Sequence, residues 1–343
     1  MVKFWKKVMA LSLSVLMLPV TLVACGGNVA TETTAVSGPT ESPEEAKVLK
    51  VLTLGHSLAL DACHMLAMIA VEEGYDGLKI GTLYNGSASL QQHVIFLTEN
   101  SREYQLYISS TETPDKIPQI MENVSMLDAI RFDNWDVFIM QSGTSEAIKE
   151  EVYTNGNIQK IQRYVNEHKT NPTARFAWNR TWATPTDNTL RDKYPYPESN
   201  PYYEVYKRYN DDRSLFYQDV AKNVKNHIIT DDTFTFMIPS GTAFENAISS
   251  YLEQTDMHRD YAHASDFGRV VAAYTWLCTI MGIEKLDEIK LDKVPVKFFK
   301  STQSTEDWVL TDMEKAIILE SVNNAIAEPL KMTQSQYTTA PQS

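Results

Sequence analysis

Two short segments near opposite ends of the chain combine residues that carry out acid–base and nucleophilic chemistry. Ser57 lies in the tetrapeptide GHSL, and Asp260 precedes His263 by three positions. A carboxylate fixes the tautomer of a histidine, and a serine hydroxyl beside such a histidine becomes a nucleophile. The pattern is typical of a serine hydrolase. Each segment alone also fits an ordinary structure, with Ser57 as a helix N-cap and residues 260–265 as a surface loop.

Two further turns carry hydrogen-bond donors that such a reaction needs. Gly86 lies in the tripeptide NGS, directly after an apolar run, and Gln141 follows the apolar run DVFIM. A tetrahedral oxyanion is stabilised by donors that are already in place, and a glycine N–H in an open turn or a side-chain amide serves this purpose. Taken singly, both segments are ordinary turns.

The segments that must position these residues alternate short apolar runs with helical patterns. Strands that alternate with helices predict an α/β fold whose mostly parallel sheet is covered on both faces. Ligands of such sheets lie beyond the carboxyl ends of the strands, where all four segments fall. We expect strands at 48–54, 78–84, 136–140, 175–178 and 234–238, an edge strand at 104–108, and helices at 59–73, 89–97, 156–168, 202–226, 243–251, 267–281 and 307–327.

Taken in this order, the four segments resemble the blocks of the SGNH/GDSL hydrolase superfamily, which carry Ser, Gly, Asn and a terminal Asp-x-x-His. GHSL, LYNGSASLQQH, NWDVFIMQSG, IPSGTAFENA and RDYAHASDFGR are similar to its DUF4886 branch, across the whole folded region. The resemblance implies the SGNH hydrolase fold, a three-layer α/β/α, flavodoxin-like sandwich with a mostly parallel sheet of about five strands. It also implies Ser57 as nucleophile, His263 as general base and Asp260 as its orienting partner. The implied oxyanion hole consists of the Ser57 N–H, the Gly86 N–H and the Gln141 amide.

Two departures from the family pattern bear on activity. His56 stands where the superfamily has Asp, or Asn in this branch, and Gln141 replaces the Asn of the third block. The longer glutamine requires a differently shaped oxyanion hole, and both changes leave room for a weakly active member.

The neighbours of the expected strand ends are candidate substrate contacts. His56 would be a donor at the rim, His258 would line the pocket, and Arg180 and Trp182 follow the fourth strand. Tryptophan is at least as common in core packing, and a loop histidine is commonly solvated. No tight cluster of His, Cys and carboxylate residues predicts a metal site.

The N-terminus predicts the compartment. Three lysines precede an apolar run at 8–23, which ends in LVAC-GG and resembles a bacterial lipobox. We therefore expect a signal peptide at 1–24, an acylated Cys25 and attachment to a membrane of the bacterial cell envelope, on its extracytoplasmic side. Residues 25–47, rich in Thr, Ser, Pro and Glu, predict a flexible tether. The hydrolase-like domain is expected at 48–331, followed by a disordered tail at 332–343.

Composition narrows the range of partners. Removal of the three lysines of the leader from the 31 basic residues leaves 28 against 44 acidic ones, a net charge of −16. Such an acidic surface argues against nucleic acid as a partner. After acylation of Cys25 only Cys63 and Cys278 remain, both in apolar helical patterns, which favours buried free thiols over a disulfide.

The reaction expected from these features is hydrolysis of small acyl esters, acetyl esters above all, through an acyl-enzyme on Ser57. It needs no cofactor. Carbohydrate as the alcohol part, or another small-molecule ester, follows from analogy and compartment alone. The alternative is a lipoprotein that binds a glycan or solute without catalysis, on a degenerate fold of the same type. A lipase is disfavoured, because the sequence has no extended apolar lid.

Overall fold

The structure, a computed structural model, describes residues 48–186, 203, 207–209, 212–299 and 305–341. The expected signal peptide, the lipidated Cys25 and the tether lie outside these ranges. Within them, no helix combines the length and the apolar character needed to cross a membrane.

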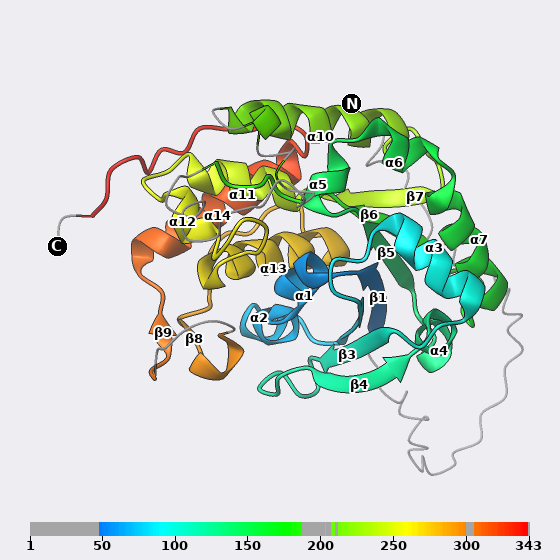
Figure 1. Cartoon of the computed structure of the whole chain (residues 1–343). Coiled ribbons are helices and arrows are strands. Elements are labelled where there is room, and N and C mark those ends of the chain that lie inside the picture. The colour runs from blue at the N-terminus through cyan, green and yellow to red at the C-terminus, as the bar shows by residue number, and fades with distance from the viewer. Residues whose placement is uncertain (1–47, 187–202, 204–206, 210–211, 300–304, 342–343) are drawn as a thin grey trace, which may run out of the picture. The chain divides into compact units, whose positions relative to one another are not determined.

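The centre of the domain is a seven-stranded sheet with the order β4-β3-β2-β1-β5-β6-β7 (Figure 1). Five neighbouring strands are parallel, as the sequence predicts, and β3 and β4 extend the sheet as antiparallel edge strands. The edge strand expected at 104–108 is present as β3, and β4, which pairs with it, is the strand that the sequence did not predict. The strands are β1 (Leu49–Gly55), β2 (Leu78–Tyr84), β3 (Tyr104–Ser110), β4 (Gln119–Val124), β5 (Val137–Gln141), β6 (Arg175–Asn179) and β7 (Phe234–Ile238).

Helices cover both faces of the sheet, which makes the fold a three-layer α/β/α sandwich (Figure 1). Successive residues of one strand pack into different layers: Val51 belongs to the first core cluster and Leu52 to the second. The first layer contains α1 (Ser57–Cys63), α2 (Leu66–Glu72), α11 (Ser240–Ile248), α13 (Asp266–Met281) and α14 (Asp312–Ala327). The second contains α3 (Leu90–Glu99), α4 (Met126–Phe132), α7 (Asn157–His168) and α10 (Arg213–His227).

Short elements complete the chain and modify two expectations. The helix expected at 59–73 is divided into α1 and α2. Cys63 and Cys278 are buried free thiols, as predicted. The remaining described elements are α5 (Thr144–Ala147), α6 (Glu150–Thr154), α12 (Gln254–Met257), a 3₁₀ turn (Val296–Phe298) and the two-stranded pair β8 (Lys293–Val294) and β9 (Trp308–Val309).

The tail expected to be disordered at 332–343 is held against α11 over part of its length, so that prediction is wrong there. The N–H of Thr333 donates to Asn246 Oδ1 at 2.8 Å, and the carbonyl of Tyr337 accepts from the N–H of Tyr251 at 2.8 Å. The polar composition of the tail suggested that its backbone groups bond to solvent, but these hydrogen bonds satisfy them within the fold.

Parallel strands bring their carboxyl ends to one edge of the sheet. Gly55 at the end of β1 pairs with Tyr84 at the end of β2, and Gln141 pairs with Asn179 at the ends of β5 and β6. The turns that follow β1, β2 and β5 therefore lie beside one another, as the four-segment hypothesis requires.

A close helix contact supports the last of the four segments. Gly268, in the first turn of α13, lies against the end of α12, and a Cβ at Gly268 would lie 2.3 Å from the carbonyl oxygen of Met257. The absence of a side chain lets α13 begin directly behind the loop at 259–263.

We expect Gly268→Ala to lower the free energy of unfolding by about 1–3 kcal/mol, because the methyl group overpacks this contact. Chemical denaturation measures the change. The matched control is Gly143→Ala, whose Cβ would meet nothing closer than 3.7 Å. Because alanine favours a helix interior over glycine, a neutral or stabilising Gly268→Ala would show that the close contact does not exist.

Candidate active site

Ser57 begins α1 immediately after β1, yet it is not the cap of that helix. The N-cap is His56, whose Nδ1 accepts a hydrogen bond from the Leu58 N–H at 3.4 Å. Because His56 performs the capping, the Ser57 hydroxyl does not need to. Its Oγ lies instead 2.7 Å from Nε2 of His263.

The loop between α12 and α13 carries the other two members of the expected triad. Both carboxylate oxygens of Asp260 lie near Nδ1 of His263, at 2.9 and 2.8 Å. Oδ1 of Asp260 also accepts the backbone N–H groups of Ala262 and His263, at 2.9 and 2.8 Å. A carboxylate can only accept, so Nδ1 carries a proton and Nε2 is left to accept the Ser57 hydroxyl proton. The structure thus joins Asp260, His263 and Ser57 in one chain of hydrogen bonds.

The charges of the site are set by burial and by these bonds. Burial alone would raise the pKa of Asp260, but its hydrogen bonds with His263 and the two backbone N–H groups lower the pKa to about 2. Burial, with the nearby charge of His263, lowers the pKa of His56 to about 4. Near neutral pH the triad carboxylate is therefore ionised and the capping imidazole is uncharged.

The first expected oxyanion donor outside the triad, Gly86, lies at the correct edge of the sheet. It follows β2, the strand next to β1, and the N–H of Asn85 donates to the carbonyl of Gly55 at 3.5 Å. Gly86 also lines a hollow of about 430 Å³ that extends across the ends of β2, β3 and β4, where the lining includes Gln105 and Glu122. This hollow opens at the same edge as the triad.

The amide of Gln141, the other expected donor, is held in a defined orientation. The indole Nε1–H of Trp276 donates to Ser240 Oγ at 3.1 Å, and the Ser240 hydroxyl donates to Asn179 Oδ1 at 2.7 Å. Nδ2 of Asn179 in turn donates to Gln141 Oε1 at 2.8 Å. An indole N–H can only donate, so Ser240 Oγ accepts it, and the hydroxyl proton of Ser240 is left to donate to Asn179.

This orientation leaves Nε2 of Gln141 as the donor turned away from Asn179. Within the described part of the chain Nε2 has no hydrogen-bond partner, and a Cβ at Gly55 would lie 3.0 Å from it. Gly55 therefore allows the amide to lie against the end of β1, two residues before the nucleophile. The amide is buried, and its contact with an oxyanion stays a prediction.

With this geometry established, the family of the chain can be stated. The model of DUF4886, a domain of unknown function, matches residues 50–305, most of the described chain. The chain belongs to the DUF4886 family. Among curated proteins none matches it.

Solved structures support the fold of this DUF4886 protein. A DUF4886 family protein from Bacteroides uniformis is similar with a TM-score of 0.67 and 22% identity, covering 85% of this chain and 100% of that one. A proposed SGNH hydrolase from Slackia heliotrinireducens gives 0.42 and 17%, covering 68% and 100%. A salicylyl-acyltransferase from a tetracycline biosynthetic pathway gives 0.34 and 14%, covering 70% and 56%. Only the first is close enough to bear on the fold.

The other expected substrate contacts of this DUF4886 protein are buried, and those predictions are wrong. The guanidinium of Arg180 lies 4.0 Å from the ring centroid of Tyr217 and donates to its carbonyl. His258 lies between the carbonyls of Gln254 and Ala183, at 3.0 and 3.1 Å. Both are 1% exposed. A position beyond the end of an element does not determine which way the side chain turns, and here both side chains turn into the core.

His56 and Trp182 are also buried, but both support the segments that carry Ser57, Asp260 and His263. His56 is the cap of the nucleophile helix and not the rim donor that the sequence suggests. Trp182 stacks on Phe244, with ring centroids 4.4 Å apart, and its indole N–H donates to the carbonyl of Ala262 at 2.7 Å. It therefore holds the loop that carries Asp260 and His263 and cannot stack on a sugar.

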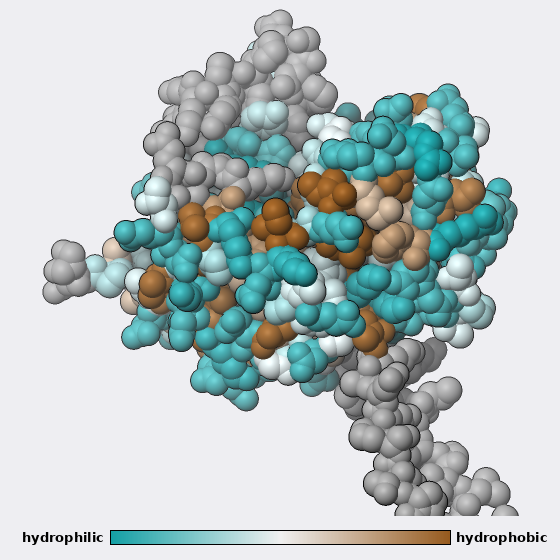
Figure 2. All heavy atoms as spheres, turned by 90° about the horizontal axis from the view of Figure 1, so that it is seen from below, coloured by the Kyte–Doolittle hydropathy of each residue, from teal (hydrophilic) through white to brown (hydrophobic). Residues whose placement is uncertain are grey.

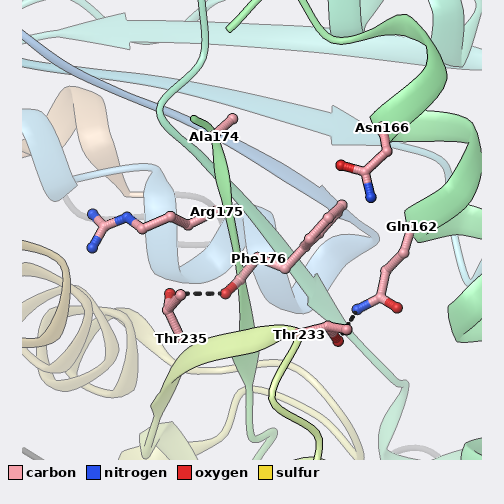
Figure 3. A pocket seen from close by; sticks show the side chains of 7 residues that line it. All are labelled: Gln162, Asn166, Ala174, Arg175, Phe176, Thr233 and Thr235. Atoms are coloured by element: carbon pink, nitrogen blue, oxygen red, sulfur yellow. Dashed lines mark hydrogen bonds between the residues drawn. The ribbon is translucent and has the colours of Figure 1, made fainter. Parts of the chain in front are cut away.

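A second cavity lies away from this chemistry. It has a volume of about 310 Å³ and is lined by residues at the start of β6 and β7, among them Arg175 and Thr235 (Figure 3). Thr235 donates to the Phe176 carbonyl at 3.0 Å, and Gln162 donates to Thr233 at 2.8 Å. These are the amino ends of the strands, opposite the triad. No cluster of three or more metal-ligating side chains occurs in the described ranges.

We expect Asp260→Asn to lower kcat by about 10²–10⁴-fold, because an amide can stabilise the wrong tautomer of His263. Stopped-assay kinetics on a small ester measure kcat and KM separately, with circular dichroism as the control for folding. A folded variant with wild-type kcat would remove Asp260 from the triad.

The same variant tests the lowered pKa of Asp260 through stability. A carboxyl with a pKa of about 2 in the fold and about 3.9 unfolded stabilises the fold above pH ~4 and ceases to do so as the pH falls through about 2. The difference in unfolding free energy between wild type and Asp260→Asn should therefore shrink from pH 5 to pH 2. Denaturant titrations across this range measure it, and a constant difference contradicts the assignment.

Proposed function

We propose that this chain is an extracytoplasmic serine esterase of the SGNH type that removes small acyl groups, acetyl above all, from carbohydrate esters. The observation that carries the proposal is the unbroken chain from Asp260 through His263 to Ser57 Oγ. Its three side chains come from two segments 206 residues apart in the sequence. Packing alone does not require a serine, an imidazole and an ionised carboxylate in this order.

The proposed reaction uses an acyl-enzyme. His263 takes the hydroxyl proton of Ser57 as Oγ attacks the ester carbonyl, and the oxyanion is stabilised by the N–H groups of Ser57 and Gly86 and by the Gln141 amide. His263, held by Asp260, then protonates the departing alcohol. Water, activated by the same imidazole, attacks the acyl group and releases the acid and the free serine. No cofactor takes part in these steps.

The polar hollow at Gly86 supports a hydroxyl-bearing alcohol rather than a lipid. The hollow beside Gly86 is lined mainly by polar side chains, including Gln105 and Glu122. The face drawn in Figure 2 is largely hydrophilic, with hydrophobic residues gathered in several places and the largest group near its centre. Exposed large apolar side chains of the described residues are spread over several elements: Ile95, Ile117, Ile120, Phe132, Leu215 and Val309. Lipid substrates are usually met by a larger continuous apolar surface.

The proposed location is the outer side of a bacterial membrane, with the acylated Cys25 as anchor and residues 25–47 as tether. The basic, apolar and LVAC-GG pattern of the leader supports it. An acidic domain on a tether would remain soluble beside an anionic membrane surface, without nucleic acid as a partner.

The test is reaction of the purified protein with a fluorophosphonate probe, followed by peptide mapping. We expect the probe on Ser57, and we expect Ser57→Ala to lose both labelling and hydrolysis of 4-nitrophenyl acetate, by about 10³-fold or more in kcat. Ser214→Ala is the matched control, because Ser214 bonds only within the exposed start of α10. Hydrolysis that survives Ser57→Ala would overturn the assignment.

The same experiment separates the esterase from the binding lipoprotein. A wild-type chain that is folded, unlabelled and inactive, but binds an acetylated oligosaccharide in calorimetry, would favour the binding protein. Labelling at Ser57 together with release of acetate from that oligosaccharide would support the esterase.

A further inference from the structure

A carboxylate that no motif marks lies one helical turn beyond the nucleophile. Asp61 is the fifth residue of α1, which begins at Ser57, and it is completely buried in an otherwise apolar helix. Residues four apart lie on the same face of a helix, so Asp61 and Ser57 share one side of α1. An isolated carboxylate is very costly to bury, and a partner must be present.

The hydrogen-bond partners of Asp61 belong to the loop at 259–264, and the buried guanidinium of Arg269 in α13 lies further away, 3.7 Å from Oδ1. Arg259 Nη1 donates to both carboxylate oxygens, at 3.0 and 3.1 Å, and the backbone N–H of Ala264 donates to Oδ2 at 3.1 Å. Arg259 and Ala264 are the residues immediately before Asp260 and immediately after His263. Asp61 therefore contacts both ends of the catalytic loop.

The loop is closed on itself where Asp61 contacts it. The N–H of Arg259 donates to the carbonyl of His263 at 3.1 Å, the guanidinium of Arg259 donates to the carbonyl of Ala264, and His258 and Ala264 form an antiparallel bridge. Displacing either end would move the whole loop, with the imidazole. Trp182, which lies in the segment after β6, holds the middle of the loop through Ala262, but it is not on the helix that begins at Ser57.

We propose that Asp61 is a positioning residue, which joins the nucleophile helix to the catalytic loop and thereby sets the contact between Ser57 and His263. The inference rests on the proposed function. Asp61 acts through the placement of Nε2, 2.7 Å from Ser57 Oγ, and touches no reacting atom. Because a displacement of about 1 Å costs on the order of 100-fold in rate, a small shift of the loop suffices to impair the reaction.

The competing explanation is that the pair of Asp61 and Arg259 only stabilises the fold. Breaking a buried pair leaves an uncompensated charge, which destabilises any protein. A double variant separates the two explanations. Asp61→Asn with Arg259→Met removes both charges of this pair and leaves Arg269 its closer partner, Asp266, at 3.1 Å. The double variant should therefore be more stable than Asp61→Asn alone, without restoring the link between α1 and the loop.

The experiment compares Asp61→Asn, the double variant and a matched control, Glu245→Gln. Glu245 forms a buried ion pair with Arg213 at 2.8 Å, joining α10 to α11 instead of α1 to the loop. The measurements are Tm, kcat and KM for 4-nitrophenyl acetate, and the rate of fluorophosphonate labelling at Ser57.

We expect Asp61→Asn to lower kcat and the labelling rate together by about 10–100-fold, with little change in KM. The double variant should regain Tm but keep the low kcat, and Glu245→Gln should lose Tm while kcat stays near that of the wild type. Recovery of kcat together with Tm in the double variant would overturn the inference, as would an Asp61→Asn variant as reactive as the wild type. A wild type that neither reacts with the probe nor hydrolyses the ester overturns the proposed function, and this inference with it.

Discussion

The hydrogen bond between Ser57 Oγ and His263 Nε2 joins side chains 206 positions apart, and the arrangement of the fold serves that contact. One end is fixed because a parallel strand delivers Ser57 to the edge of the sheet at the start of α1. The other end is fixed because α13 packs closely behind the base loop, where Gly268 has no side chain. Both α1 and α13 belong to the same apolar layer, so the core that stabilises the domain also sets the spacing of the site.

Buried polar groups give this core its directional information. Apolar packing tolerates small displacements, whereas a hydrogen bond between buried groups must be satisfied in one geometry. Asp61 with Arg259 determines where the loop lies relative to α1. Trp276, through Ser240 and Asn179, determines which end of the Gln141 amide is presented. Each of these two sets of hydrogen bonds contains a group that can only donate or only accept, the indole N–H of Trp276 and the carboxylate of Asp61. Such a group limits the directions in which the neighbouring amides and hydroxyls can bond.

The sequence predicted the parallel strands well, because strands depend on local patterns. It also named Ser57, Asp260 and His263, which the structure brings together. The apolar runs at 78–84 and 234–238 coincide with β2 and β7. Serine, histidine and aspartate have few chemical roles in combination, so their residue types alone suggested a triad. The direction of a side chain beyond the end of an element does not follow from the local sequence. Arg180 and Trp182 after β6, and His258 after α12, turn into the core, where they contact Tyr217, Phe244 and backbone carbonyls. The sequence carried one indication that Asp61 is important, because it is a single acidic residue within an apolar helical pattern. Its partner Arg259 lies 198 positions away and could not be identified from the sequence.

His56 explains how a serine at a helix start can keep its hydroxyl free of capping bonds. A serine in that place is ordinarily used as a cap, and a hydroxyl engaged by backbone N–H groups is poorly placed to attack a carbonyl. With His56 as the N-cap, the chain moves the capping acceptor one residue back and leaves the Ser57 hydroxyl to His263. Because burial holds the pKa of His56 near 4, the cap accepts its bond as a neutral imidazole. The Asn that the resemblance implies for this branch would be an equally neutral cap, so His56 changes the size of the capping side chain and not the charge beside Ser57.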